Sequence, residues 1–197
     1  MYITFKKKQK RASDDEDNNE TPNIGSYENN IYFYDDVNTK NIFILNTLLE
    51  EVKKNIQCKE LIDKSIDYIN LYIHSNGGGV YAGLSAMSYI ENLGIDVYTY
   101  VDGFVASAAT FILLGGKYIY MQKYSNVLIH QMSTGIWGKF DELIDEVENS
   151  KTVMKNIRNI YETKCNLPKI VLDTLFQKDV YLTSQQCLQY NVIHEII

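Results

Sequence analysis

The chain has 197 residues, of which 45% are hydrophobic and 22% are charged. This composition is typical of one globular domain and excludes a disordered, fibrous or small disulfide-stabilised protein. The net charge of -6 argues against nucleic acid as a partner, because binding to phosphates requires a basic surface.

The three cysteines are odd in number and scattered, which predicts neither a disulfide framework nor a paired cysteine metal site. No apolar run approaches the roughly 20 residues that would span a bilayer, and the N-terminus lacks the apolar core of a signal peptide. We therefore expect a cytoplasmic protein that does not associate with a membrane.

Residues 1–25 differ in composition from the rest of the chain. A basic run, KKKQKR, is followed by acidic residues and then by Pro22 and Gly25. The segment has little apolar surface to bury, so we predict a disordered charged tail. The basic run is also compatible with a nuclear signal or a patch that docks on anions. The folded domain is expected to cover residues 26–197.

From Ile31 onward, short β-rich runs alternate with helical patterns, which predicts an α/β fold built from βαβ units. The expected strands are Ile31–Tyr34, Ile69–His74, Val97–Val101, Tyr118–Met121 and Val127–Gln131. The expected helices cover residues 39–55, 80–92 and 107–115.

A longer helix is expected from Lys139, because apolar residues recur at helical spacing as far as Tyr161. Pro168 disfavours helix at the residue before it, so this helix should end near Asn166. After it we expect a short helix, a helix capped by Thr183 or Ser184, and a closing strand over residues 192–197.

The segment Ser75–Gly79 reads SNGGG and lies at a predicted strand-to-helix turn. Glycines permit positive φ and leave backbone N–H groups bare, which favours anions. The segment lacks the Lys-Ser/Thr of a phosphate-binding loop and the spacing of a dinucleotide fingerprint, so nucleotide binding is not predicted. Taken alone, it is equally compatible with a plain tight turn.

Ser107 lies at a second strand-to-helix junction, in GFVASAA, where small neighbours leave room for a substrate. The N–H of Ala108 could face a developing oxyanion, although a serine at this place is by itself more typical of a helix N-cap. His130 ends an apolar strand in NVLIHQ. A lone strand histidine is usually structural, and we place His74 and His194 in that class.

Together these segments resemble the ClpP family, the proteolytic subunits of Clp proteases. The shared features occur in family order: a glycine pair after a strand, a turn ending in serine, an Ile-His-Gln strand and a late aspartate followed by an aromatic. The matching segments here are Gly77–Gly78, Gly103–Ser107, Ile129–Gln131 and Asp179–Ser184, and the resemblance covers roughly residues 28–197.

The resemblance implies a ClpP/crotonase-like βαβ spiral with a long-helix handle, and a serine endopeptidase. Ser107 would be the nucleophile, His130 the base and Asp179 the residue that orients it, with Asp173 as the second candidate for that last role. The N–H groups of Gly78 and Ala108 would form the oxyanion hole. No metal or organic cofactor is implied.

The family also implies heptameric rings stacked in pairs, an AAA+ unfoldase as partner, and unfolded polypeptides as substrates. A substrate would lie as an added strand between the segment after Gly78 and a hairpin at Thr134–Gly138. The handle would comprise the helix from Lys139 and a hairpin at residues 133–138.

Several positions depart from the family pattern. Asn76 and Met132 stand where the family usually has proline, Ala108 replaces a methionine, and Asn191 replaces a glycine. Gln177 and Lys178 replace an acid-arginine pair implicated in ring-to-ring contact, which predicts weaker ring pairing.

Three alternatives remain open at this point. A catalytically silent ring subunit of the same fold would typically lack a triad residue. A crotonase-like acyl-CoA enzyme would not need the Ser-His-Asp set. A serine-lysine peptidase would require a lysine base and usually a membrane anchor.

Overall fold

The computed structural model describes residues 21–60 and 67–197, so most of the predicted tail lies outside the described residues. Its centre is one sheet in the order β1-β2-β3-β4-β5-β8, with β6 pairing β4 and β7 pairing β6. The strands are β1 Ile24–Tyr27, β2 Asn30–Phe33, β3 Tyr68–Ser75, β4 Asp96–Ala106, β5 Tyr118–Met121, β6 Asn126–Leu128, β7 Tyr181–Thr183 and β8 Glu195–Ile196. The β1–β2 and β6–β7 pairs are antiparallel, and the other pairs are parallel.

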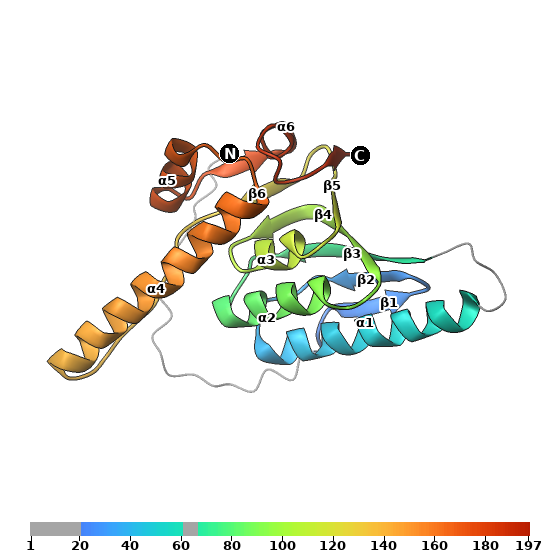
Figure 1. The fold of residues 1–197 in the computed structure, drawn as a ribbon, viewed down its shortest axis with the longest axis horizontal. Coiled ribbons are helices and arrows are strands. Elements are labelled where there is room, and N and C mark those ends of the chain that lie inside the picture. Colours follow the sequence, from blue (N-terminus) through green and yellow to red (C-terminus); the bar gives the residue numbers. More distant parts are fainter. Residues whose placement is uncertain (1–20, 61–66) are drawn as a thin grey trace, which may run out of the picture.

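Helices connect the successive parallel strands from β2 to β5, as the alternating pattern predicts. The helices are α1 Thr39–Glu60, α2 Val80–Glu91, α3 Ala109–Leu114, α4 Phe140–Lys164, α5 Lys169–Gln177 and α6 Ser184–Gln189. Helices α1, α2 and α3 lie on the same side of the sheet (Figure 1). The fold is therefore the expected α/β succession of βαβ units.

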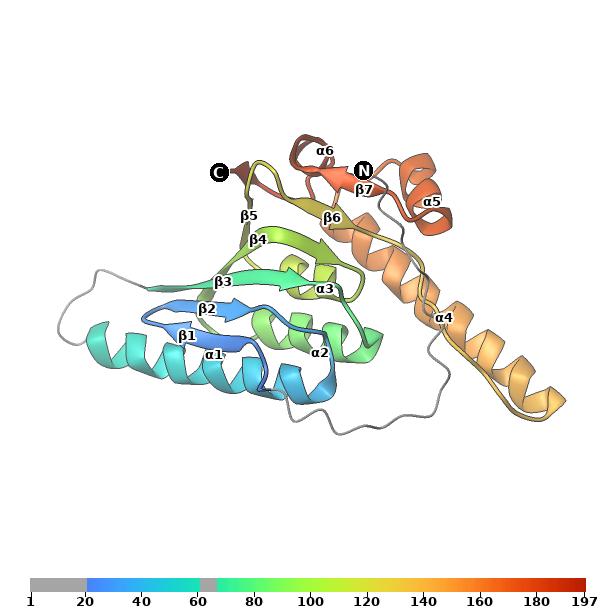
Figure 2. The ribbon, with the colours of Figure 1, turned by 180° about the vertical axis from the view of Figure 1, so that it is seen from behind.

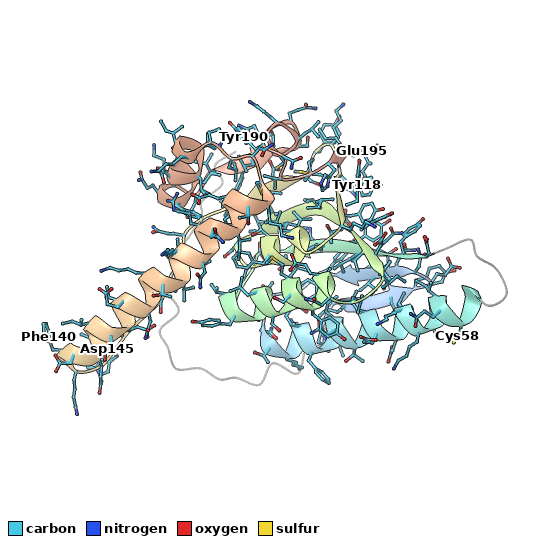
Figure 3. The ribbon with its side chains drawn as sticks, viewed as in Figure 1. Cys58, Tyr118, Phe140, Asp145, Tyr190 and Glu195 are labelled. Carbon is cyan, nitrogen blue, oxygen red and sulfur yellow. The ribbon has the colours of Figure 1, made fainter. Side chains whose placement is uncertain are left out.

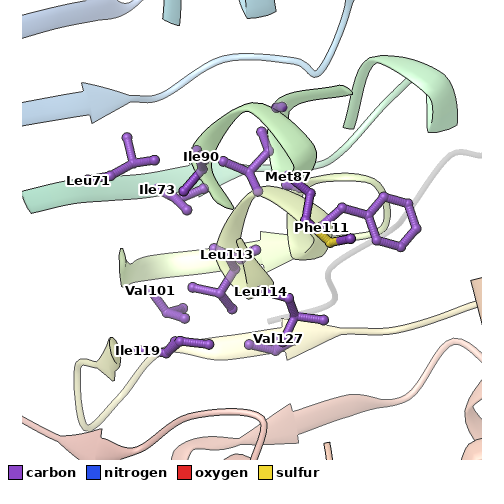
Figure 4. Packing of buried hydrophobic residues seen from close by; sticks show 14 of the residues in the cluster. Leu71, Ile73, Met87, Ile90, Val101, Phe111, Leu113, Leu114, Ile119 and Val127 are labelled. Carbon is purple, nitrogen blue, oxygen red and sulfur yellow. The ribbon is translucent and has the colours of Figure 1, made fainter. Parts of the chain in front are cut away.

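Alternate residues of β3 form the core. Ile69, Leu71 and Ile73 are fully buried, while the residues between them face the other side of the sheet. Side chains from α2 and α3 cover this buried face, including Met87 and Phe111 (Figure 4). Complete burial of one such side chain contributes about 1.5–3 kcal/mol, so this layer fixes the position of the strand ends.

The opposite face of the sheet carries a row of tyrosines. Tyr32, Tyr72, Tyr100 and Tyr120 stack across four strands with ring centroids 5.1, 4.5 and 4.8 Å apart. Aromatic cross-strand pairs contribute about 0.5–1.5 kcal/mol beyond their buried area. Tyr118, labelled in Figure 3, stacks on His194 at 4.7 Å.

Helix α4 projects from the body of the molecule, as Figures 1 and 2 show from opposite sides. Only Ile157 and Tyr161 of this helix are buried, and both lie in its second half. At the projecting end Phe140 is 76% exposed. The carboxylate of Glu142 accepts a hydrogen bond from the Lys139 N–H, which fixes the start of the helix.

The predicted hairpin at residues 133–138 is wrong, because residues 131–139 contain no strand. Residues 133–139 are all exposed, so no apolar side of this segment is buried to hold a strand pair together. The strand predicted at 127–131 ends at Leu128, and the closing strand is confined to Glu195–Ile196.

Other boundaries also differ from the predictions. Strands β1 and β7 were not predicted, and the boundary after residue 25 falls inside β1. Helix α1 runs to Glu60, and β4 continues through Gly103 to Ala106. Helix α4 and the cap of α6 by Thr183 agree with the predictions, and the Thr183 hydroxyl accepts from the Gln186 N–H.

Candidate active site

Ser107 is half-buried and stands between β4 and α3, with φ of +54°. A non-glycine residue at positive φ is uncommon, and such strained positions cluster at functional sites. Its backbone is held on both sides: the Ser107 N–H donates to the Leu128 carbonyl at 2.9 Å, and its carbonyl accepts from the Thr110 hydroxyl at 2.6 Å.

Ser107 is not the N-cap of α3. Ala108 occupies that position and makes no side-chain capping bond. The Ser107 hydroxyl forms no hydrogen bond to any residue in the described part of the chain. The helix-cap interpretation therefore fails, and the hydroxyl is free for another role.

The glycine turn packs directly against the nucleophile candidate. Gly77 has φ of +92°, and a Cβ placed on it would lie 2.6 Å from the Cβ of Ser107. Val37 pairs with the turn from the other side, where its N–H donates to the Gly77 carbonyl and its carbonyl accepts from the Gly79 N–H. This bridge leaves the N–H of the exposed Gly78 without a hydrogen-bond acceptor among residues 21–60 and 67–197.

His130 and Asp179 meet through the pairing of β6 with β7. The register pairs Val127 with Leu182 and Leu128 with Tyr181, and extending it by two pairs places His130 opposite Asp179. The distance from His130 Nδ1 to Asp179 Oδ1 is 3.8 Å. This is an electrostatic contact but is too long for a hydrogen bond. His130 is 26% exposed and Asp179 is 78% exposed.

Ser107 and His130 follow the ends of β4 and β6, two strands that pair in parallel. Ala106 pairs with Leu128, and His130 follows two residues later. No Ser107–His130 hydrogen bond is formed among the described residues. Catalytic hydrogen bonds are often long or absent in apo structures and shorten in the substrate complex.

Asp173, the second candidate for orienting His130, is already engaged. Its carboxylate accepts a hydrogen bond from Arg158 Nη2 at 2.6 Å, and the same guanidinium lies over the ring of Phe176. Val37 and Thr110 were missed as supports of the site. Val37 acts through backbone hydrogen bonds to the glycine turn and Thr110 through its hydroxyl on the Ser107 carbonyl, and no local motif signals either contact.

Two departures from the family pattern have a structural account. The N–H of Met132 contacts the sulfur of Met154 in α4 at 3.3 Å, a contact that a proline could not make. Asn191 has φ of +53°, which asparagine tolerates better than most residues that could replace glycine.

The described residues contain neither a metal-binding cluster nor a membrane-spanning helix. Within residues 21–60 and 67–197, no group of three or more His, Cys, Asp or Glu side chains is arranged to hold a metal ion. No helix in these ranges combines the length and apolar character needed to cross a bilayer.

The structure thus combines a serine on a strained strand-to-helix turn with a histidine-carboxylate pair beyond the paired ends of β6 and β7, which is compatible with a serine hydrolase. The Clp protease family model matches residues 27–197. The chain therefore belongs to the Clp protease family.

Curated relatives carry the same assignment. The ATP-dependent Clp protease proteolytic subunit 1 of Borreliella burgdorferi is 28% identical over 182 residues, which cover 89% of this chain and 93% of the relative. The proteolytic subunit of Cyanophora paradoxa is 32% identical over 135 residues, or 65% of this chain and 67% of the relative. These matches confirm the predicted family and the class of serine peptidase, and they do not favour a catalytically silent subunit.

A solved structure supports the fold independently. A point mutant of ClpP1 from Listeria monocytogenes superposes with a TM-score of 0.66 at 22% identity, covering 86% of this chain and 91% of that one. This confirms the predicted ClpP-like α/β fold.

Proposed function

We propose that Ser107, His130 and Asp179 form the catalytic triad of this peptidase. His130 would accept the hydroxyl proton as Ser107 Oγ attacks the scissile carbonyl, and would then donate that proton to the leaving amine. Asp179 would hold the imidazole in the required tautomer and stabilise its cation. The observation that carries the proposal is the β6–β7 register, which sets His130 opposite Asp179.

The proposed oxyanion hole consists of the N–H groups of Gly78 and Ala108. Support comes from the packing of Gly77 against Ser107, and from the bridge to Val37, which leaves the Gly78 N–H unused. A donor of this kind typically lowers the barrier by about 3 kcal/mol.

Substitution of the triad tests the proposal. Ser107→Ala should abolish both hydrolysis of a short fluorogenic peptide and labelling by a fluorophosphonate. His130→Ala should lose both activities, and Asp179→Asn should lose turnover while remaining folded, because the wrong tautomer is costly. Asp67→Asn, at an exposed position before β3, is the matched control and should retain activity. Turnover by Ser107→Ala above background would overturn the assignment.

We further propose that the protein forms heptameric rings, stacked in pairs, that enclose the active sites. The relatives' description as ATP-dependent supports a partner that hydrolyses ATP, which we propose is an AAA+ unfoldase. Unfolded polypeptides as substrates and a cytoplasmic location are part of the same proposal. The isolated protein should then cleave short peptides and leave a stably folded protein intact. Rapid digestion of a folded protein without an unfoldase would contradict the chamber.

The exposed apolar side chains at the projecting end of α4 support a contact between rings. Phe140 is 76% exposed, and Ile144 and Val147 are each 47% exposed. Gln177 and Lys178 are exposed and cannot reproduce an acid-arginine pair. We expect stacked rings that dissociate on dilution or in salt, with peptidase activity falling in parallel. Light scattering and peptidase assays over one dilution series measure both, and a monomer at every concentration would refute ring formation.

A further inference from the structure

Strand β4 changes its neighbour shortly before it delivers the nucleophile. Residues Tyr98–Val101 pair with β5, whereas Phe104–Ala106 pair with β6. Ser107 continues the second pairing, because its N–H donates to the Leu128 carbonyl. The point at which β4 stops pairing with β5 therefore determines the position of Ser107 relative to β6 and to His130, which follows β6.

The change occurs at a bulge in β4. The β3–β4 register pairs Ile73 with Val101 and then Ser75 with Val105, so His74 alone lies opposite the segment Asp102–Phe104. Gly103 within that segment has φ of +84°. Bulges bend a strand and redirect the residues that follow.

His74 holds one side of the bulge. Its Nδ1 lies 2.7 Å from the Asp102 carbonyl oxygen. Because a carbonyl oxygen only accepts, Nδ1 must carry the hydrogen. The imidazole also lies against Gly103, where an added Cβ would be 3.0 Å from Nδ1.

The other side of the bulge is held by the buried Ser125. Its hydroxyl accepts from the Gly103 N–H at 2.9 Å and donates to the Val101 carbonyl at 3.2 Å. The Asp102 carboxylate in turn accepts a hydrogen bond from the Tyr34 hydroxyl. The segment that redirects β4 is thus fixed at its carbonyl, its N–H and its side chain.

We propose that His74 is a positioning residue for catalysis, a role that rests on the proposed triad. Its Nδ1–H bond to the Asp102 carbonyl joins β3, which leads into the Gly77–Gly78 turn, to β4, which leads into Ser107. The bond thereby sets the nucleophile against both the oxyanion donors and His130. In this role His74 acts through the backbone of β4 and not through contact with the substrate, so its loss should act on the chemical step and leave substrate binding intact.

Three substitutions separate the hydrogen bond from the bulk of the ring. His74→Asn keeps an N–H donor at the place of Nδ1, His74→Gln moves the amide one methylene further, and His74→Leu removes the donor. We expect Leu and Gln to lower kcat for a short peptide, and the rate of fluorophosphonate labelling, by up to about tenfold, the typical net worth of one hydrogen bond. KM should stay within about twofold, and His74→Asn should keep kcat within about twofold of the parent.

The assays are run at a concentration where light scattering shows every variant in the same assembly as the parent. His194→Gln is the histidine control, because His194 accepts a hydrogen bond from the Ile119 N–H and forms none with the bulge in the described part of the chain. It should leave kcat unchanged. If His74→Leu does not fold, Ser125→Ala provides a second test and should reduce kcat in the same way.

Full kcat in His74→Leu, or equal losses in His74→Asn and His74→Leu, would overturn the inference. A loss of kcat that tracks a fall in Tm across the variants would also overturn it, by showing a merely structural role. The triad itself is tested separately: an inactive Ser107→Ala beside a fully active His74→Leu refutes only the role of His74.

Discussion

Gly77→Ala probes the contact between the glycine turn and the nucleophile. The Cβ of alanine would lie 2.6 Å from both the Ala106 carbonyl oxygen and the Ser107 Cβ, and 3.1 Å from the Ala108 nitrogen. Two of these neighbours are backbone atoms of the residues on either side of Ser107, so the turn and Ser107 must move apart. The φ of +92° adds strain for any residue with a side chain.

Two other glycines separate these effects. Gly94 has φ of +78° with nothing within 4 Å of an added Cβ, so Gly94→Ala reports backbone strain alone, about 1–2 kcal/mol. Gly25 has open space and no positive φ, so Gly25→Ala should change stability by less than about 0.5 kcal/mol. Gly77→Ala combines strain with overpacking of about 1–3 kcal/mol, which predicts a loss of about 2–5 kcal/mol.

Urea unfolding at one fixed protomer concentration measures the free energies, because assembly makes stability depend on concentration. Peptidase activity should remain in Gly25→Ala and Gly94→Ala and be lost in Gly77→Ala, even below the unfolding transition. If Gly77→Ala is no less stable than Gly94→Ala and remains active, the turn does not pack against Ser107 as described.

Three further changes test other parts of the fold. Burial raises the pKa of the Cys165 and Cys187 thiols to about 12, so iodoacetamide at about pH 8 should modify the exposed Cys58 alone. Intact-mass measurement without denaturant counts the modified thiols, and more than one modification would contradict this expectation. Arg158→Ala removes the ion pair to Asp173 and should lower the free energy of unfolding by about 1–2 kcal/mol and with it the Tm. Lys151→Ala removes the exposed pair to Glu148 and should leave Tm unchanged. Equal Tm values for the two variants would contradict this expectation. Burial, followed by the neighbouring tyrosines, raises the pKa of Tyr100 from 10.0 to about 12. The folded state therefore holds this proton more tightly, so the free energy of unfolding should fall as pH rises from about 10 to about 12. Tyr100→Phe should reduce that fall, and an unchanged slope of the free energy of unfolding against pH would refute the assignment.

The fold follows from the sequence where local pattern and burial agree. In β3, alternation of polar residues with Ile69, Leu71 and Ile73 matches a strand with one face in the core, and the prediction is confirmed. The hairpin at residues 133–138 fails because strand-forming residues there have no apolar surface to cover. Strand β7 was missed because three residues carry too short a pattern, and it exists only by pairing with β6.

For the candidate site too, the sequence predicts the residues but not how they are placed relative to one another. Motif order identifies Ser107, the glycine turn, His130 and Asp179 as candidates. Their mutual placement depends on registers between segments that are distant in the chain, such as Val127 with Leu182. His74 is instructive, since a histidine in a strand signals nothing by itself, and its contact with Asp102 depends on a bulge that the sequence marks only through Gly103.

The left-handed backbone of Ser107 sets activity and stability against each other. At φ of +54° a glycine would be accommodated without the cost that a side chain incurs, about 1–2 kcal/mol. Selection for stability alone would therefore favour Ser107→Gly, a change that removes the proposed nucleophile. With serine at this position, the fold gives up part of its marginal stability to hold a hydroxyl beside the glycine turn.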